Sequence, residues 1–266
     1  MTWQLYDQTF QHRLLLGTAA YPTLAVLQQA LSTAHPAMIT VSLRRQASTD
    51  KSNGQALWHL LQQLSLPILP NTAGCLSVQE AVTTAQMARE VFATDWIKLE
   101  LIGDDDTLQP DIFQLVEAAR ILIQDGFKVL PYCTEDLIAC RRLLDVGCQA
   151  LMPWAAPIGT GLGVVHEYAL RVLRERLPDI PLIIDAGLGL PSQAAQVMEW
   201  GFDAVLLNTA VSRSGEPILM AQAFAQAIEA GRMAYEAEPI VPHQQARAST
   251  PTIGQPFWHS SEYEMS

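Results

Sequence analysis

The chain has 266 residues, a length that suits one large domain or two small ones. Hydrophobic residues make up 49% of it, and the net charge of −11 argues against a nucleic-acid partner. The sequence contains no apolar run of 18 residues and no basic segment followed by an apolar one at its N-terminus, so we expect no membrane span, no signal peptide and a cytoplasmic location. The four cysteines form no C-x-x-C pair and the six histidines have no metal-site spacing, so neither a metal nor a cofactor is expected.

Short apolar runs alternate with amphipathic stretches along most of the chain. Eight such runs start 23 to 31 residues apart, at 13–18, 38–43, 67–72, 96–102, 127–133, 150–155, 181–186 and 204–210. Helical patterns fill the gaps, for example at 78–92 and 166–177. Buried runs separated by helices indicate parallel strands. We therefore predict an α/β fold with a single (β/α)8 TIM barrel over residues 1–250 and a mobile C-terminal tail over 251–266, with an open doubly wound sheet as the alternative.

The fourth run places two charged residues inside an apolar strand. Side chains alternate along a strand, so Lys98 and Glu100 share the face that points into the barrel. Of the two other lysines, Lys51 falls in a polar loop and Lys128 opens a strand at the opposite end of the barrel. We expect burial to lower the pKa of Lys98 and supply the neutral amine that imine formation with a ketone requires. The alternative is an ion pair with Glu100 that only fills the barrel.

The last three strands end in residues that suit acid–base chemistry and anion binding. Asp185 ends the seventh strand, where a carboxylate can move protons, although a helix cap or turn is an equal alternative. Three segments follow consecutive strands, at 158–163, 186–189 and 208–210. Phosphate in barrels is often held by such loops, and glycine lets the backbone approach it. We predict a phosphate site there. The G-T-G-L-G run does not match the dinucleotide fingerprint, so a nicotinamide cofactor is not supported.

Other features have less specific interpretations. The run Asp104-Asp105-Asp106 suggests a solvated loop more than a Mg²⁺ site. Cys75 follows the third strand but has no base beside it in sequence, so a catalytic nucleophile is the less favoured interpretation of this residue. The pair Arg44-Arg45 ends the second strand, where a guanidinium can bind an anion or form a salt bridge at the rim.

In order along the chain, several segments resemble bacterial thiazole synthase, the enzyme that builds the thiazole phosphate of thiamine. They are Leu16-Gly17-Thr18, TVSLRR at 40–45, LPNTAGC at 69–75, Ile97-Lys98-Leu99-Glu100, Met152-Pro153, PIGTGLG at 157–163, Ile184-Asp185-Ala186-Gly187, Leu207-Asn208-Thr209-Ala210 and Ala230-Gly231-Arg232. Each segment is weak alone, but the ordered set spans about residues 5 to 251 and is specific. The segment after Arg45 and the region after Pro251 depart from the family pattern.

The resemblance implies a reaction, partners and site residues. The family condenses 1-deoxy-D-xylulose 5-phosphate with dehydroglycine (2-iminoacetate) and sulfur, which arrives as a thiocarboxylate on a ubiquitin-like sulfur-carrier protein. The resemblance assigns imine formation to Lys98 and proton transfers to Glu100 and Asp185. It assigns sugar-phosphate binding to Gly159, Ala186, Gly187, Asn208 and Thr209, and it implies a homotetramer that can also meet the dehydroglycine-producing enzyme. The alternatives are another Schiff-base barrel, such as a class I aldolase or a pyridoxal phosphate synthase, and a non-catalytic barrel that binds the carrier.

Overall fold

Eight parallel strands form a closed barrel in the computed structural model, which describes residues 2–43, 51–64, 66–247 and 249. The strands are β3 (Leu14–Gly17), β4 (Met38–Ser42), β5 (Ile68–Asn71), β6 (Trp96–Leu99), β7 (Lys128–Cys133), β8 (Met152–Pro153), β9 (Ile183–Asp185) and β10 (Ala204–Leu207). Their order is β8-β7-β6-β5-β4-β3-β10-β9, and a parallel bridge between Leu151 and Leu182 joins its two ends. The predicted (β/α)8 barrel is confirmed, and the open sheet is wrong.

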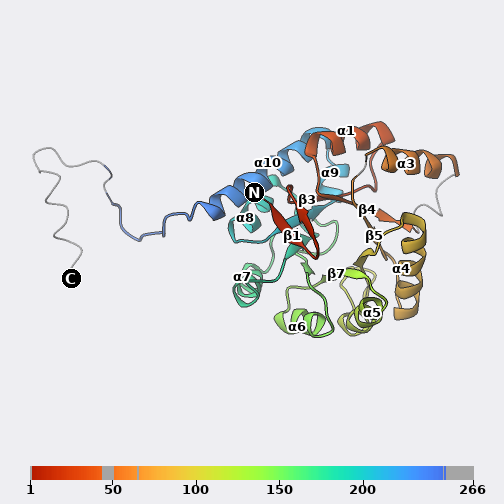
Figure 1. Ribbon diagram of the computed structural model, residues 1–266. Helices are drawn as coiled ribbons and strands as arrows, with labels where there is room; N and C mark the ends of the chain where they lie inside the picture. Colours follow the sequence, from red (N-terminus) through yellow and green to blue (C-terminus); the bar gives the residue numbers. More distant parts are fainter. Residues whose placement is uncertain (1, 44–50, 65, 248, 250–266) are drawn as a thin grey trace, which may run out of the picture.

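Helices surround the barrel (Figure 1). They are α1 (Leu24–Ala34), α3 (Lys51–Leu64), α4 (Val78–Phe92), α5 (Ile112–Gln124), α6 (Leu137–Asp145), α7 (Glu167–Arg176), α8 (Pro191–Glu199), α9 (Thr209–Ser212) and α10 (Pro217–Glu236). The loop predicted around Lys51 is wrong, because α3 begins at that residue. The last predicted strand is too long, since Asn208 already caps α9. The predicted tail at 251–266 lies outside the described residues.

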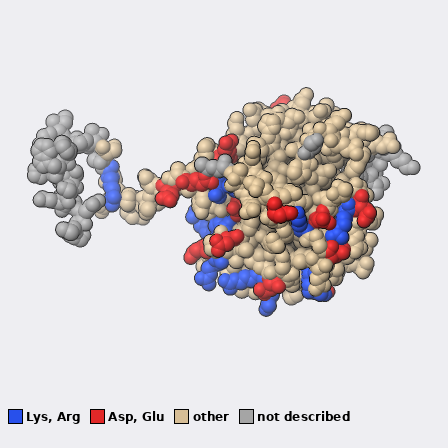
Figure 2. Space-filling model, in the orientation of Figure 1, with Lys and Arg blue, Asp and Glu red and all other residues tan. Residues whose placement is uncertain are grey.

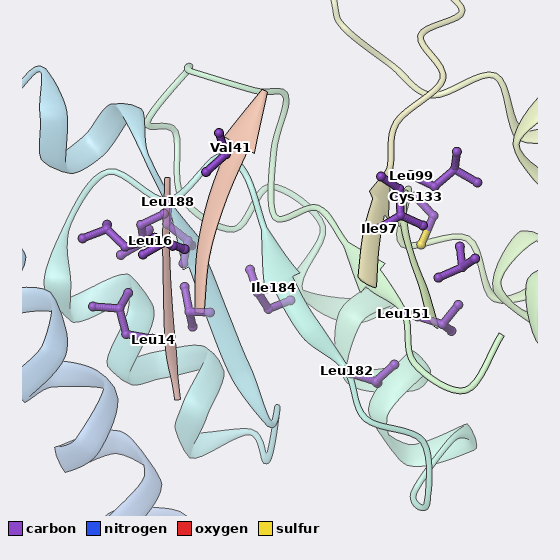
Figure 3. Packing of buried hydrophobic residues seen from close by; sticks show 14 of the residues in the cluster. Leu14, Leu16, Val41, Ile97, Leu99, Cys133, Leu151, Leu182, Ile184 and Leu188 are labelled. Atoms are coloured by element: carbon purple, nitrogen blue, oxygen red, sulfur yellow. The ribbon is translucent and has the colours of Figure 1, made fainter. Parts of the chain in front are cut away.

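Strand alternation divides the core into two parts. The outward side chains pack against the helices, and Figure 3 shows Leu14, Leu16, Ile97, Leu99 and Ile184 in this layer. A second cluster fills the barrel, with Leu15, Met38, Leu69, Leu130 and Ile183 among its buried side chains. This apolar cluster leaves only the carboxyl-terminal ends of the strands for polar groups.

A short antiparallel hairpin, β1 (Trp3–Leu5) with β2 (Gln8–Phe10), closes the amino-terminal end of the barrel. Trp3, Leu5 and Phe10 pack onto the interior cluster, and the Tyr6 hydroxyl donates to the carbonyl of Val129 at 2.7 Å. In Figure 1 the hairpin lies in front of the strands. This hairpin thus covers the amino-terminal end of the barrel.

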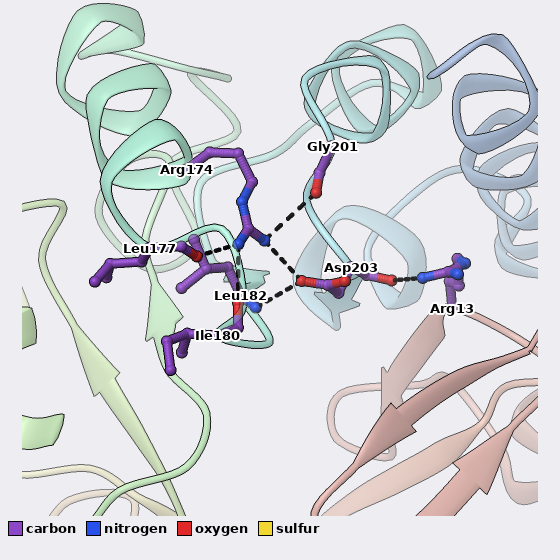
Figure 4. A network of polar contacts seen from close by, with 7 residues as sticks. All are labelled: Arg13, Arg174, Leu177, Ile180, Leu182, Gly201 and Asp203. Atoms are coloured by element: carbon purple, nitrogen blue, oxygen red, sulfur yellow. Dashed lines mark hydrogen bonds and ion pairs between the residues drawn. The ribbon is translucent and has the colours of Figure 1, made fainter. Parts of the chain in front are cut away.

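Arg174 ties together the segments that lead into β9 and β10 (Figure 4). Its guanidinium donates to the carbonyls of Leu177 and Ile180 and, at 2.9 Å, to Oδ2 of Asp203. The same Asp203 oxygen accepts from the backbone N–H of Leu182 at 2.9 Å. This network is at the end of the barrel away from the polar groups, where it stabilises the fold.

The surface charges are unevenly distributed. On the face drawn in Figure 2, Lys and Arg are mixed with Asp and Glu over the lower part, and the upper part is mostly uncharged. The sequence of α1, LAVLQQALSTA, contains no charged residue. Within the described residues, every helix is too short or too polar to span a bilayer.

Candidate active site

A cavity of about 610 Å³ opens at the carboxyl-terminal ends of the strands. Side chains from β4, β5, β6 and β9 line its interior, and the loops after β8, β9 and β10 line its rim. All eight residues that we predicted for catalysis and sugar-phosphate binding border it: Lys98, Glu100, Gly159, Asp185, Ala186, Gly187, Asn208 and Thr209. The structure therefore brings the predicted residues together in one place.

Lys98 lies between two carboxylates at the base of this cavity. Its Nζ is 2.5 Å from Oδ2 of Asp185 and 3.2 Å from Oε1 of Glu100. The three side chains are at most 8% exposed. The inward orientation of Lys98 and Glu100 is confirmed, because Ile97, Leu99 and Leu101 pack in the outer layer. Asp185 reaches Lys98 from β9, three strands away around the barrel.

The expected direction of the Lys98 pKa shift is wrong. Burial by itself lowers the pKa of this amine, but the attraction of Asp185 and then of Glu100 outweighs it, so the pKa is raised. Burial raises the pKa of Asp185 to about 6, against the opposing effect of the Lys98 charge. At rest the amine is therefore a buried ammonium with Asp185 as its closest proton acceptor.

Thr72 fixes the backbone of Glu100. The Thr72 hydroxyl, which is fully buried, donates to the Glu100 carbonyl at 2.7 Å and accepts from the Glu100 N–H at 2.8 Å. Regular pairing of β6 ends at Leu99, so this single side chain satisfies both backbone groups of Glu100 just beyond the strand. It thereby holds the carboxylate in reach of Lys98.

Tyr132 is a buried side chain beside the amine. Its ring centroid is 5.7 Å from Nζ of Lys98, and its hydroxyl donates to the carbonyl of Leu108 at 3.4 Å. Burial raises the pKa of this phenol, and the charges of Asp185 and Glu100 add to the effect. The neutral aromatic face suits a cation at the position of the amine.

The predicted phosphate site is built from loops that need unusual backbone angles. Gly159 and Gly187 have φ angles of +78° and +85°, and Ala186 has +75°. A Cβ on Gly187 would lie 2.3 Å from the backbone nitrogen of Ala156, so that position has no room for a side chain. Gln193 secures the turn that follows, because its Oε1 accepts from the N–H of Gly189 at 2.8 Å.

Two of the other sequence-based candidates, Cys75 and the run 104–106, lie apart from the cavity. Cys75 is fully buried in the outer layer with its Sγ 3.5 Å from the Thr84 hydroxyl, and it does not line the cavity. The carboxylates of 104–106 are exposed, and within the described residues no cluster of His, Cys, Asp and Glu has the arrangement of a metal site. The pair Arg44-Arg45 lies outside the described residues.

Sequence reasoning missed Thr72, Tyr132, Ser42 and Asn71. Tyr132 lies two residues beyond the inward Leu130, and Asn71 lies two beyond the inward Leu69. The alternation rule applied to β6 therefore carried a signal for both side chains. No comparable pattern marks the Thr72 hydroxyl, which acts across two neighbouring strands.

A family model, curated relatives and a solved structure are similar to this chain. The model of the family "Thiazole biosynthesis protein ThiG" matches residues 4–251. The chain is 78% identical to the thiazole synthase of Neisseria meningitidis over 97% of this chain and 99% of that protein. It is 65% identical to the thiazole synthase of Cupriavidus pinatubonensis over 98% of this chain and 94% of that protein. Among solved structures, it resembles the Amycolatopsis orientalis BexX/CysO complex with a TM-score of 0.80 and 30% identity, over 91% of this chain and 98% of that one.

Proposed function

Because the chain belongs to the thiazole biosynthesis protein ThiG family, whose relatives are thiazole synthases, it forms the thiazole phosphate of thiamine, and we propose that Lys98, Glu100 and Asp185 carry out the chemistry. The observation that carries this proposal is the buried Lys98 amine held between two carboxylates at the base of the cavity. The reaction joins 1-deoxy-D-xylulose 5-phosphate, dehydroglycine and sulfur.

Imine formation starts with the loss of a proton from Lys98. Asp185, 2.5 Å from Nζ, accepts that proton, and the neutral amine then adds to the ketone of the sugar phosphate. Loss of water from the adduct gives an iminium at Nζ. Since the iminium keeps the positive charge, Asp185 and Glu100 stabilise it as they stabilise the ammonium. The raised pKa of Lys98 is therefore compatible with the chemistry.

The iminium makes the neighbouring carbon of the sugar acidic. A carboxylate within reach removes its proton, and reprotonation along the chain shifts the carbonyl so that sulfur can add. Glu100 is the second carboxylate at Lys98, with its Oε1 3.2 Å from Nζ. A well-placed acid–base group contributes roughly 10²–10⁴-fold to such a step. Glu100 and Asp185 thus share the proton transfers on one bound substrate.

The sugar phosphate is anchored on the loops after β8, β9 and β10. Gly159, Ala186, Gly187, Asn208 and Thr209 border the cavity there. The backbone at these turns approaches a ligand closely, and N–H groups at a helix start favour an anion. This anchor leaves the ketone free to reach Lys98.

The sulfur donor is a thiocarboxylate on a carrier protein whose C-terminal end enters the same opening. The BexX/CysO structure, a complex with a sulfur-carrier protein, supports this kind of partner.

We also propose that the chain forms a homotetramer. The sequence of α1, which contains no charged residue, supports this assembly, because the cores of subunit interfaces are depleted of charged residues.

Two alternatives from the sequence lose support. The family match is to thiazole synthase, which distinguishes the chain from class I aldolases and pyridoxal phosphate synthases that share a Schiff-base lysine. The three charged residues at the base of the cavity argue against a non-catalytic barrel.

Turnover with purified components tests the function. Thiazole phosphate, measured by mass spectrometry, is expected only when the sugar phosphate, 2-iminoacetate and thiocarboxylated carrier are all present. The Lys98→Arg variant keeps the charge but is expected to be inactive. Equal product without the thiocarboxylate, or full activity of Lys98→Arg, contradicts the proposal.

A further inference from the structure

Another part of the cavity wall is formed by β4 and β5. In the eight-stranded barrel, β5 lies three places from β8 and β10 and four from β9, whereas β4 lies two places from β10. Ser42 on β4 and Asn71 on β5 line the cavity there. A sugar phosphate that is anchored after β8, β9 and β10 and bound to Lys98 leaves this wall free for another reactant.

Sheet register places these two polar side chains in one row with the reactive amine. Ser42 pairs with Asn71, and Asn71 pairs with Lys98. Leu69, one inward step below Asn71, and Met38, two inward steps below Ser42, belong to the apolar interior cluster, which sets the inward direction for both strands. A molecule in contact with Asn71 therefore lies next to the sugar carbon bound to Lys98.

The hydrogen bonds of this wall leave specific donors available. Oδ1 of Asn71 accepts from the N–H of Ala73 at 3.4 Å, which directs the amide N–H₂ away from that loop. Thr18, also on the cavity wall, uses its hydroxyl on the Thr40 carbonyl at 2.9 Å. Among described residues, no hydrogen bond engages Nδ2 of Asn71 or the hydroxyl of Ser42. These groups can donate to an acceptor in the cavity.

The charges around the amine select the kind of ligand. Asp185 repels a carboxylate on the β9 side of Lys98, whereas Asn71 and Ser42, on the β5 side of the amine, are neutral and can donate hydrogen bonds. A small carboxylate is therefore best accommodated on the β4–β5 side. We propose that Asn71 and Ser42 form the subsite for the carboxylate of the second carbon substrate, an α-imino acid such as 2-iminoacetate. This inference rests on the proposed function of the same cavity.

Oxamate, a planar carboxylate with an adjacent amide, is a stable probe for this subsite. In the wild-type enzyme with carrier and sugar phosphate, oxamate is expected to compete with 2-iminoacetate. Asn71→Ala is expected to raise both the oxamate inhibition constant and the half-saturating 2-iminoacetate concentration by about 10- to 100-fold, as for loss of a hydrogen bond to a charged group. Asn71→Ser, which restores a donor, is expected to recover part of the loss.

The sugar site supplies the matched controls. In Asn71→Ala, the sugar-phosphate concentration that half-saturates borohydride trapping is expected to stay within about twofold of wild type. In Thr209→Val, that concentration is expected to rise, whereas the oxamate inhibition constant is expected to stay unchanged. Should Asn71→Ala fold poorly, Ser42→Ala removes only one hydroxyl and is expected to weaken oxamate in the same direction. An unchanged oxamate constant, or an equal rise in the sugar constant, overturns the subsite. Failure of the wild-type enzyme to trap the sugar contradicts the proposed function instead.

Discussion

The Thr72 hydroxyl offers the sharpest test of how the fold positions the site. Thr72→Val keeps the shape of the side chain but removes the group that bonds to both the N–H and the carbonyl of Glu100, at 2.8 and 2.7 Å. Each buried backbone group left without a partner costs about 1–3 kcal/mol. For the two groups together we expect a loss of about 2–6 kcal/mol in the free energy of unfolding. Thr72→Ser, which keeps the hydroxyl, is expected to lose less than half of that.

The same variant separates the role of Glu100 from that of Asp185. When the Glu100 backbone is released, its carboxylate is no longer fixed 3.2 Å from Nζ of Lys98, whereas Asp185 on β9 keeps its contact. We therefore expect Thr72→Val to trap the sugar phosphate on Lys98 but to form thiazole phosphate at least about tenfold more slowly, because a positioned acid–base group is lost.

Denaturant unfolding, borohydride trapping and turnover, measured on Thr72→Val and Thr72→Ser, provide the assay. If Thr72→Val matches Thr72→Ser in turnover, the hydroxyl does not position Glu100. If trapping and turnover fall together, the variant has disturbed Lys98 itself, and the proposed division of roles is wrong.

Three further outcomes follow from the structure. Burial raises the pKa of Asp185 to about 6, and this carboxylate must be ionised to accept the Lys98 proton, so turnover should rise with pH through about 6. The Asp185→Asn variant should lose that inflection in the pH profile and should turn over roughly 10²–10⁴-fold more slowly. An unchanged pH profile would contradict the role of Asp185. Arg174→Ala should lower stability by about 2–4 kcal/mol in thermal or urea unfolding with little change in kcat, because it removes the charged partner of Asp203 and the donor to the carbonyls of Leu177 and Ile180, far from the cavity. A selective loss of kcat would count against this. Gly187→Ala should raise half-saturation by the sugar phosphate, because its Cβ collides with Ala156, and normal binding would show that the turn can relax.

Much of the fold is visible in the sequence because the barrel repeats one signal eight times. Buried strands such as 38–42 and helices such as 78–92 carry their own apolar patterns. The hairpin at the N-terminus was missed because its strands are three residues long, too short for a periodic signal. The start of α3 at Lys51 was missed because the polar residues around it resemble a loop.

Only some properties of the site can be predicted from the residue pattern of a single strand. Alternation within β6 was enough to point Lys98 and Glu100 inward. The pKa of Lys98, however, depends on Asp185, which lies far away in the sequence and reaches the amine across the barrel. Thr72 likewise acts on Glu100 through backbone groups of a neighbouring strand. Such effects depend on three-dimensional contacts that a single strand does not encode.

The covalent use of Lys98 is the central claim, and peptide mapping after borohydride reduction tests it most directly. Wild-type enzyme incubated with 1-deoxy-D-xylulose 5-phosphate and reduced should carry the sugar adduct on the peptide that contains Lys98, and Lys98→Ala should carry none. An adduct on Lys51 or Lys128, or one that persists in Lys98→Ala, would contradict the account.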